Sequence, residues 1–370
     1  MQTDLFQLLH RTASEAGFER FGVAPATRPE MLELEKFASW VDAGYAGEME
    51  YLKRRNEAGE YKRSSLEQAL PWAKSVIVTA MNYNSSAPKS TDPAEPTSGW
   101  ISRYAHSRRD YHDTVLGALR RVQSTLVAYC RSRENEVITR SYVDTGPVLE
   151  RVYAKYAGVG WVGKNTCIIN QELGSWIFLG VIVTSLEFSQ FVGDERLTIA
   201  PDRCGTCTRC IDACPTQAII APRQLDASRC IAYFTIEKRG AIPEDVRAHI
   251  GRHVFGCDIC QDVCPWNRKA PVTTNPDFQA DESLINPDLA QLAGLSAQDF
   301  RQQFRASPMS RAKHSGLMRN VAMAMGNSGR VEYISELEQL AESGDANVAE
   351  HAVWAIERLK ELQQSSVEKV

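Results

Sequence analysis

Eight of the ten cysteines in this chain lie between residues 204 and 264 and follow a fixed spacing. The first run reads C-x2-C-x2-C-x3-C-P from Cys204 to Pro215, and the second reads C-x2-C-x3-C-P from Cys257 to Pro265. Runs of the first kind bind iron–sulfur clusters in bacterial ferredoxins, where the fourth cysteine binds the other cluster of the pair. The spacing therefore predicts a segment that folds around two [4Fe–4S] clusters.

The same rule divides the cysteines between the two clusters. The predicted ligands of the first cluster are Cys204, Cys207, Cys210 and Cys264, and those of the second are Cys214, Cys257, Cys260 and, by elimination, Cys230. Two structural zinc sites would also use four cysteines each, but the spacing of the first run favours clusters. Cys130 and Cys167 are left over, and their apolar surroundings predict thiols of the core.

Length and composition restrict what can surround this segment. The chain has 370 residues, of which 42 are basic and 46 acidic, so its net charge is −4. A chain of this length can bury a core without disulfides and can hold two or three domains. Neither a signal peptide nor an apolar membrane span is visible, so we expect a cytoplasmic protein whose cysteines serve metal sites. Any contact with nucleic acid must come from a local basic patch.

The sequence as a whole predicts an α+β fold in three parts. Residues 1–195 read as mixed α/β, with helices at 5–16 and 111–132 and strands at 75–79, 136–143 and 176–183. Residues 196–275 form the bacterial-ferredoxin-like part with two clusters. Residues 276–370 predict an α-helical unit similar to a HEAT repeat, in which Ser315-Gly316 reads as a break between helices.

Two motifs of the first part bear on chemistry. Residues 158–163 match the dinucleotide motif G-x-G-x-x-G, but we expect a helix before them and a strand after them, the reverse of a Rossmann site. Asp144 follows a predicted strand and precedes Pro147, which we expect at the first position of a helix that ends near Gly158. By itself, an aspartate in this place reads as a turn or capping residue.

Taken in order, these motifs resemble those of the epoxyqueuosine reductases. The resemblance rests on DTGPVLER at 144–151, GVGWVGKN at 158–165, GSW at 174–176 and the eight cysteines, and it covers nearly the whole chain. It implies an oxidoreductase of queuosine biosynthesis that reduces epoxyqueuosine to queuosine at the wobble position of tRNA anticodons. It also implies that residues 1–195 bind cobalamin, which an external electron donor reduces through the two clusters.

The resemblance implies roles for particular residues as well. Asp144 would be the proton donor, and such an acid must be protonated near neutral pH, which burial favours. The expected cobalamin contacts are Trp161, Gly163, Lys164, Asn165 and Ser175, with Arg63 and Tyr104 as further candidates. The cobalamin-ligand motif D-x-H-x-x-G is absent, because Val115 stands where the stretch that begins at Asp110 would need its glycine.

Two other functions remain open on the sequence alone. An enzyme similar to reductive dehalogenases would also combine cobalamin with paired clusters, but that family uses a tyrosine as proton donor and is typically exported with a twin-arginine signal. A ferredoxin-type electron carrier without enzymatic activity would leave the large first part of the chain without a role.

One stretch of the chain is basic enough to contact RNA. Residues 301–320 contain no acidic residue and include Arg301, Arg305, Arg311, Lys313 and Arg319. Such a run is usually a solvated helix face, but the substrate that the resemblance implies is a polyanion. We therefore expect Arg311, Lys313 and Arg319 to contact tRNA, and we expect the chain to act as a monomer.

Overall fold

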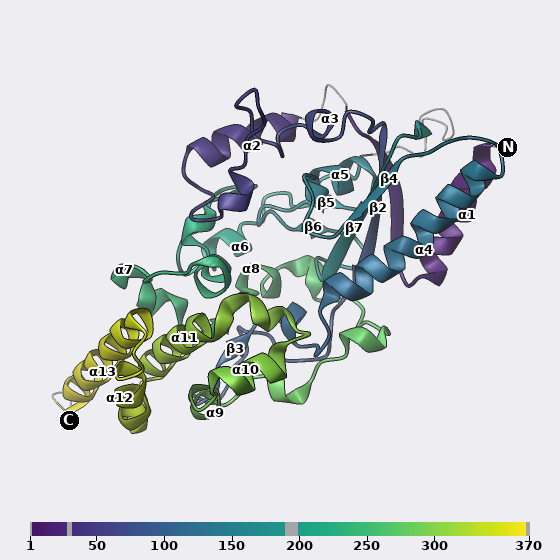
Figure 1. The fold of residues 1–370 in the computed structure, drawn as a ribbon. Coiled ribbons are helices and arrows are strands. Elements are labelled where there is room, and N and C mark those ends of the chain that lie inside the picture. Colours follow the sequence, from purple (N-terminus) through teal and green to yellow (C-terminus); the bar gives the residue numbers. More distant parts are fainter. Residues whose placement is uncertain (1, 28–31, 189–198, 368–370) are drawn as a thin grey trace.

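The computed structural model describes residues 2–27, 32–188 and 199–367. Its first part is built on a four-stranded antiparallel sheet with the strand order β1-β2-β7-β4 (Figure 1). The strands are β1 (Arg20–Pro25), β2 (Ser75–Asn82), β4 (Thr139–Tyr142) and β7 (Ile177–Thr184). Every residue of β2 is buried, because this inner strand has other elements on both faces.

Helices lie on both faces of the sheet. On one face lie α1 (Gln2–Glu15) and α4 (Tyr111–Arg131), and on the other lies α5 (Glu150–Tyr156). Leu119 of α4 belongs to the first of the two resulting cores, and Val152 of α5 belongs to the second. The predicted helices at 5–16 and 111–132 and the three predicted strands are confirmed to within a few residues.

Short elements connect this sheet to the rest of the chain. They are α2 (Leu32–Asp42), α3 (Leu66–Ala69), β3 (Trp100–Ile101), and the hairpin of β5 (Trp161–Val162) and β6 (Ile168–Ile169). The G-x-G-x-x-G match at 158–163 therefore follows α5 and contains β5, as expected for a stretch that is not a Rossmann site.

The cysteine-rich segment has little regular structure. Its elements are α6 (Arg209–Asp212), β8 (Ile219–Ala221), β9 (Gln224–Leu225), α7 (Glu244–Arg247), β10 (His253–Phe255) and α8 (Ile259–Asp262). The four-residue helices α6 and α8 each contain one cysteine of a run, Cys210 and Cys260. Because β10 pairs in parallel with β3, this segment is joined to the first part of the chain.

The last part is helical. Its elements are α9 (Leu289–Ala293), α10 (Ala297–Phe304), α11 (Lys313–Ser328), α12 (Ile334–Ala341) and α13 (Ala346–Val367). The central helix α11 packs against α13, which also contacts α12 (Figure 1). Within the described residues, no helix is both long and apolar enough to cross a membrane.

Two local predictions are wrong. Ser315-Gly316 does not separate two helices, because α11 begins at Lys313 and continues through both residues into a buried stretch that starts at Leu317. Pro147 is not the first residue of a helix, because α5 begins three positions later, at Glu150. Residues 143–149, between β4 and α5, form the loop that carries Asp144.

Candidate active site and cluster-binding segment

Asp144 lies in the loop that follows β4. Its φ of 55° is left-handed, a conformation that aspartate tolerates better than most residues. Gly146 lies under Tyr142, and a Cβ at this position would overlap with the tyrosine ring, so the tight loop requires glycine. The loop leaves the side chain of Asp144 exposed. The protein side chains by themselves therefore do not bury this aspartate.

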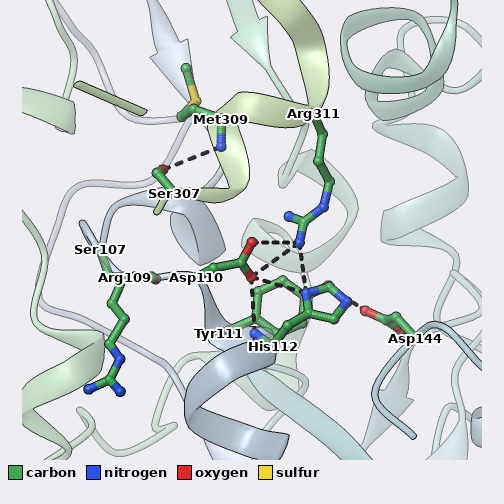
Figure 2. A network of polar contacts seen from close by, with 9 residues as sticks. All are labelled: Ser107, Arg109, Asp110, Tyr111, His112, Asp144, Ser307, Met309 and Arg311. Atoms are coloured by element: carbon green, nitrogen blue, oxygen red, sulfur yellow. Dashed lines mark hydrogen bonds and ion pairs between the residues drawn. The ribbon is translucent and has the colours of Figure 1, made fainter. Parts of the chain in front are cut away.

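Tyr111, the first residue of α4, holds the Asp144 side chain (Figure 2). Its hydroxyl donates a hydrogen bond to Asp144 Oδ2. The tyrosine ring stacks on Phe178 with a centroid distance of 4.2 Å and an interplanar angle of 3°. Burial, and then the charge of Asp144, raise the pKa of Tyr111 well above its usual value. The phenol therefore keeps its proton and remains a hydrogen-bond donor.

A charged network lies next to Tyr111 (Figure 2). Asp110 caps α4 by accepting a hydrogen bond from the His112 amide at 3.0 Å. Arg311 Nη2 donates to both carboxylate oxygens of Asp110, at 3.1 and 2.9 Å, and lies 2.7 Å from His112 Nδ1. Burial raises the pKa of Asp110, but the hydrogen bonds from His112 and the charge of Arg311 outweigh it and lower the pKa to about 2. Arg311 thus joins the helical part to the start of α4.

Two predicted cofactor contacts lie near Asp144. The ring of Tyr104 meets that of Tyr111 edge-on, with centroids 5.9 Å apart. The Arg63 guanidinium lies 5.8 Å from the ring centre of Tyr51. Burial raises the pKa of Tyr51 to about 12. The charge of Asp144 adds to this increase, and the charge of Arg63 opposes it. The structure therefore brings Arg63 and Tyr104 to the surroundings of Asp144.

Glu150 begins α5, six positions after Asp144, and the sequence did not mark it as a site residue. Its Oε1 is buried and has no hydrogen-bond partner among the described residues. Burial, and then the charge of Asp144, raise the pKa of Glu150 to about 7. The residue belongs to the DTGPVLER motif, which was a signal for its importance. Tyr111 was missed too, because its surroundings were read only as an incomplete cobalamin motif.

Two of the three side chains predicted to contact RNA have partners inside the protein. Arg319 is 1% exposed, and its guanidinium donates to three backbone carbonyls at 2.6 to 3.0 Å. Arg311 is bound to Asp110 as described above. Both side chains are used inside the protein because α11 and the turn before it pack against neighbouring parts of the chain. Lys313 is exposed and remains available.

The eight clustered cysteines separate into two groups, and each group draws on both runs. The first comprises Cys204, Cys207, Cys210 and Cys264, and the second comprises Cys214, Cys230, Cys257 and Cys260. In the first group, burial and then the charges of the other three thiols raise the pKa of Cys210 to about 11. In the second, burial and then neighbours that include Cys230 raise the pKa of Cys257 well above its usual value. The groups have the same members as the two predicted ligand sets.

Among the described residues, no three His, Cys, Asp or Glu side chains are close enough together to hold one metal ion. In a [4Fe–4S] cluster each cysteine binds a different iron, so the four sulfurs stand further apart than around one zinc ion.

The polar residues of the GWVGKN and GSW motifs bind the cysteine-rich segment. Lys164 Nζ and Asn165 Nδ2 donate to backbone carbonyls of that segment at 2.7 and 3.3 Å. Ser175 Oγ donates to Gln261 Oε1 at 2.8 Å. These three side chains therefore join the cysteine-rich segment to the β5–β6 hairpin and to the start of β7, and their expected contact with the cofactor stays a prediction.

Trp161 and Gly163 are packing residues in this structure. Trp161 is 3% exposed and packs in one apolar cluster with Cys264. Its Nε1 is buried and has no hydrogen-bond partner in the described part of the chain. A Cβ on Gly163 would lie 2.6 Å from Ile169 Cδ1, so a larger residue there would require the Ile169 side chain to shift.

The two remaining cysteines have different surroundings. Cys130 is buried in α4, as expected. Cys167 lies just before β6, and its thiol forms a hydrogen bond with that of Cys260. Cys167 therefore lies beside the second cysteine group rather than in a purely apolar core.

Two family models match the chain. The model described as epoxyqueuosine reductase QueG, DUF1730, matches residues 63–145, which include Asp144. The model described as a 4Fe-4S double cluster binding domain matches residues 203–267, which include all eight clustered cysteines.

Curated relatives and solved structures agree with these matches. An epoxyqueuosine reductase from Xanthomonas campestris pv. campestris is 39% identical over 366 residues, covering 96% of each chain. One from Escherichia coli K12 is 34% identical and covers 99% of this chain and 92% of its own. A crystal structure of epoxyqueuosine reductase with an epoxyqueuosine-modified tRNA-Tyr stem loop has a TM-score of 0.84 at 27% identity, covering 100% of this chain and 95% of its own.

A further structure shows the mobile loop of a relative. The epoxyqueuosine reductase from Bacillus subtilis with its catalytic aspartate loop swung out of the active site has a TM-score of 0.83 at 28% identity, covering 100% of this chain and 95% of its own. Similarity over nearly the full length to curated reductases disfavours both the dehalogenase-like enzyme and the plain electron carrier. The chain belongs to the epoxyqueuosine reductase family.

Proposed function

We propose that this chain reduces epoxyqueuosine to queuosine in tRNA, with cobalamin as cofactor and two [4Fe–4S] clusters as the electron path. One observation carries the proposal: a chain similar to curated epoxyqueuosine reductases over 96% of its length presents an exposed aspartate, Asp144, held by Tyr111. The tRNA substrate is supported by the similar structure that contains an epoxyqueuosine-modified stem loop.

The stoichiometry of the reduction determines which protons the protein must supply. Reduction of an epoxide to an alkene consumes two electrons and two protons and releases the oxygen as water. The Asp144 carboxyl donates a proton to the opening oxygen, while the Tyr111 hydroxyl fixes the position of that carboxyl. Because Asp144 is exposed, a base extended from the anticodon loop can reach it directly.

The cysteine groups fit two clusters. We assign Cys204, Cys207, Cys210 and Cys264 to one, and Cys214, Cys230, Cys257 and Cys260 to the other, in a ferredoxin-like arrangement over residues 196–275. The buried indole N–H of Trp161, which has no acceptor among the described residues, packs beside Cys264, and a sulfur of the cluster would accept its hydrogen bond. An external one-electron donor supplies the clusters.

The residues around Asp144 also fit cobalamin in residues 1–195. Bound cobalamin would supply the reductive cobalt chemistry for opening the epoxide. The guanidinium of Arg63 and the phenol of Tyr104 are donors that suit the amide carbonyls of the corrin, and Lys164 retains further N–H donors. Asp144 does not line either of two surface pockets, of about 530 and 440 Å³. The assignment of the cobalamin contacts therefore rests on the hydrogen-bond donors of these side chains.

Residues 276–370 form the proposed tRNA-binding unit, with helices paired in a HEAT-like manner. Arg301, Arg305 and Lys313 are exposed on α10, at its end and at the start of α11. We assign phosphate contacts to these three side chains in place of Arg311 and Arg319, since phosphate contacts position the RNA while the active site recognises the base. We further propose that the chain acts as a monomer in the cytoplasm.

Conversion of the modified nucleoside tests the proposal. The protein is purified anaerobically, loaded with iron, sulfide and cobalamin, and incubated with a chemical reductant and tRNA that carries epoxyqueuosine. Mass analysis of the digested tRNA should show queuosine, which is lighter by one oxygen, and omission of cobalamin should abolish it. If epoxyqueuosine persists in the complete mixture while both clusters and cobalamin are bound, the proposed function is wrong.

A further inference from the structure

Resting on the proposed function, we infer that Arg311 is a positioning residue of the active site, which acts on Asp144 through Tyr111. Arg311 belongs to the turn Pro308–Ala312, which lies between α10 and α11 in the helical part. Asp144 belongs to the loop after β4 in the first part of the chain. The helical part then aligns the proton donor in addition to its proposed binding of RNA.

The turn that carries Arg311 is firmly held. Three of its five residues are buried, and the Ser307 hydroxyl before it accepts a hydrogen bond from the Met309 amide at 3.3 Å. From the cysteine-rich segment, Arg239 Nη1 donates to the backbone carbonyl of Arg311 at 3.0 Å. Because the backbone of Arg311 is held in this way, its side chain can restrain the groups that the guanidinium binds.

The guanidinium of Arg311 binds the residues on either side of Tyr111 in the sequence (Figure 2). Its Nη2 lies 3.1 and 2.9 Å from the carboxylate oxygens of Asp110 and 2.7 Å from Nδ1 of His112. The guanidinium carbon also lies over the ring of Tyr111, 5.4 Å from its centre, which is within the range of a cation–π contact. The side chains of Arg311 and Asp110 are only 29% and 21% exposed, so salt and water screen this ion pair less than a pair on the open surface.

Tyr111 passes this restraint on to Asp144. Its hydroxyl donates a hydrogen bond to Asp144 Oδ2. Asp144 is exposed and has a left-handed φ of 55°, a conformation that a residue other than glycine keeps where its surroundings hold it. Stacking on Phe178 orients the Tyr111 ring, whereas the contacts of Arg311 hold the start of α4, from which the ring projects. The position of the Asp144 carboxyl therefore depends on Arg311, although the two side chains belong to different parts of the chain.

Two other roles for Arg311 make different predictions. An arginine that contacts RNA phosphates sets the affinity for tRNA and the salt dependence of binding. An ion pair that only stabilises the fold changes the free energy of unfolding and leaves the turnover of the folded protein unchanged. A positioning residue instead lowers kcat while tRNA binding stays the same, because its effect is exerted on the group that donates the proton.

Kinetics of Arg311→Met on the anaerobic, cofactor-loaded protein separate these roles. The kcat for queuosine formation should fall roughly 10- to 100-fold, since small displacements of a reacting group cost that much. The dissociation constant for tRNA and its salt dependence should equal those of the wild type. Arg311→Lys keeps the charge but lacks the planar fork of donors, so it should recover part of the rate.

The matched control is Arg109→Met. Arg109 immediately precedes Asp110 and also forms an ion pair with an aspartate, Asp277, at 2.9 Å. Its side chain points away from Asp144 (Figure 2). Arg109→Met should react at the wild-type rate. An unchanged kcat in Arg311→Met, or weaker tRNA binding that accounts for its slower reaction, would overturn the inference.

A double-mutant cycle tests the route through Tyr111. In a protein that already carries Tyr111→Phe, the change Arg311→Met should slow the reaction little further, because the hydroxyl through which Arg311 acts is gone. Losses that multiply in the double variant would show that Arg311 acts by another route and would overturn the inference. Asp110→Asn, which keeps a helix-capping side chain but removes the charge that Arg311 binds, should lower kcat in the same direction.

Hydrogen exchange provides a measurement that needs no turnover. In Arg311→Met, the amides of residues 143–149 should exchange faster than in the wild type, because the loop opens more often. Arg109→Met should leave this exchange unchanged. Equal exchange of the loop in Arg311→Met and the wild type would contradict the inference. If the wild type forms no queuosine, the proposed function fails instead, and the exchange of residues 143–149 still decides whether Arg311 restrains the loop of Asp144.

Discussion

The hydrogen bond between Tyr111 and Asp144 gives the sharpest prediction of this structure. Tyr111→Phe removes the hydroxyl that donates to Asp144 Oδ2 but keeps the ring, which stacks on Phe178 at 4.2 Å. A hydrogen bond to a charged group contributes about 1.5–3 kcal/mol. If that free energy holds Asp144 in place for proton donation, its loss should lower the rate of queuosine formation by roughly 10- to 100-fold.

The assay is anaerobic turnover of epoxyqueuosine-containing tRNA, with cluster and cobalamin content measured on the same sample. Both contents should be unchanged in Tyr111→Phe. The matched control is Tyr61→Phe, which removes another tyrosine hydroxyl that donates to an aspartate, Asp42, at 2.6 Å. Tyr61→Phe should react at the wild-type rate. Equal rates for Tyr111→Phe and the wild type would refute the idea that this hydroxyl positions the proton donor.

Three further outcomes follow from the same structure. Cys230→Ala should lose one cluster's share of iron, whereas Cys130→Ala should keep full iron content, and equal iron in both variants would contradict the ligand assignment. Arg319→Met should lower the free energy of unfolding by about 3 kcal/mol or more in denaturant titrations, because it leaves buried carbonyls without a donor, while the exposed Arg305→Met should change little. Replacing Arg301, Arg305 and Lys313 together with Ala should reduce the slope of log K against log salt for tRNA binding by about 2 to 3, and an unchanged slope would place the RNA elsewhere.

Local patterns in the sequence predicted much of the architecture. The helix at 111–132 and the strand at 75–79 have a regular apolar periodicity, and both are present in the structure. The membership of the two cysteine groups was also predictable, because ferredoxin-type ligands lie at short, fixed intervals around a cluster. In each case the information lies within a few neighbouring residues.

Features that depend on distant partners were not predictable. Arg319 has the appearance of a surface charge, yet its guanidinium is satisfied by backbone carbonyls about 80 residues away in sequence. Tyr111 reaches Asp144 across 33 positions, and only the folded sheet brings them together. Glu150 stands in a visible motif, but nothing local indicates that its carboxyl oxygen is buried without a partner.

The central claim is that Asp144 donates a proton during reduction of epoxyqueuosine, and Asp144→Asn tests it most directly. The asparagine keeps the size of the side chain and can still accept the hydrogen bond from Tyr111, so the loop should be preserved. The measurement is the rate of queuosine formation in tRNA by the cofactor-loaded variant and the wild type under the same reductant. The account predicts intact clusters, bound cobalamin and normal tRNA binding, with a rate lower by about 100- to 10,000-fold. A rate close to that of the wild type would contradict it.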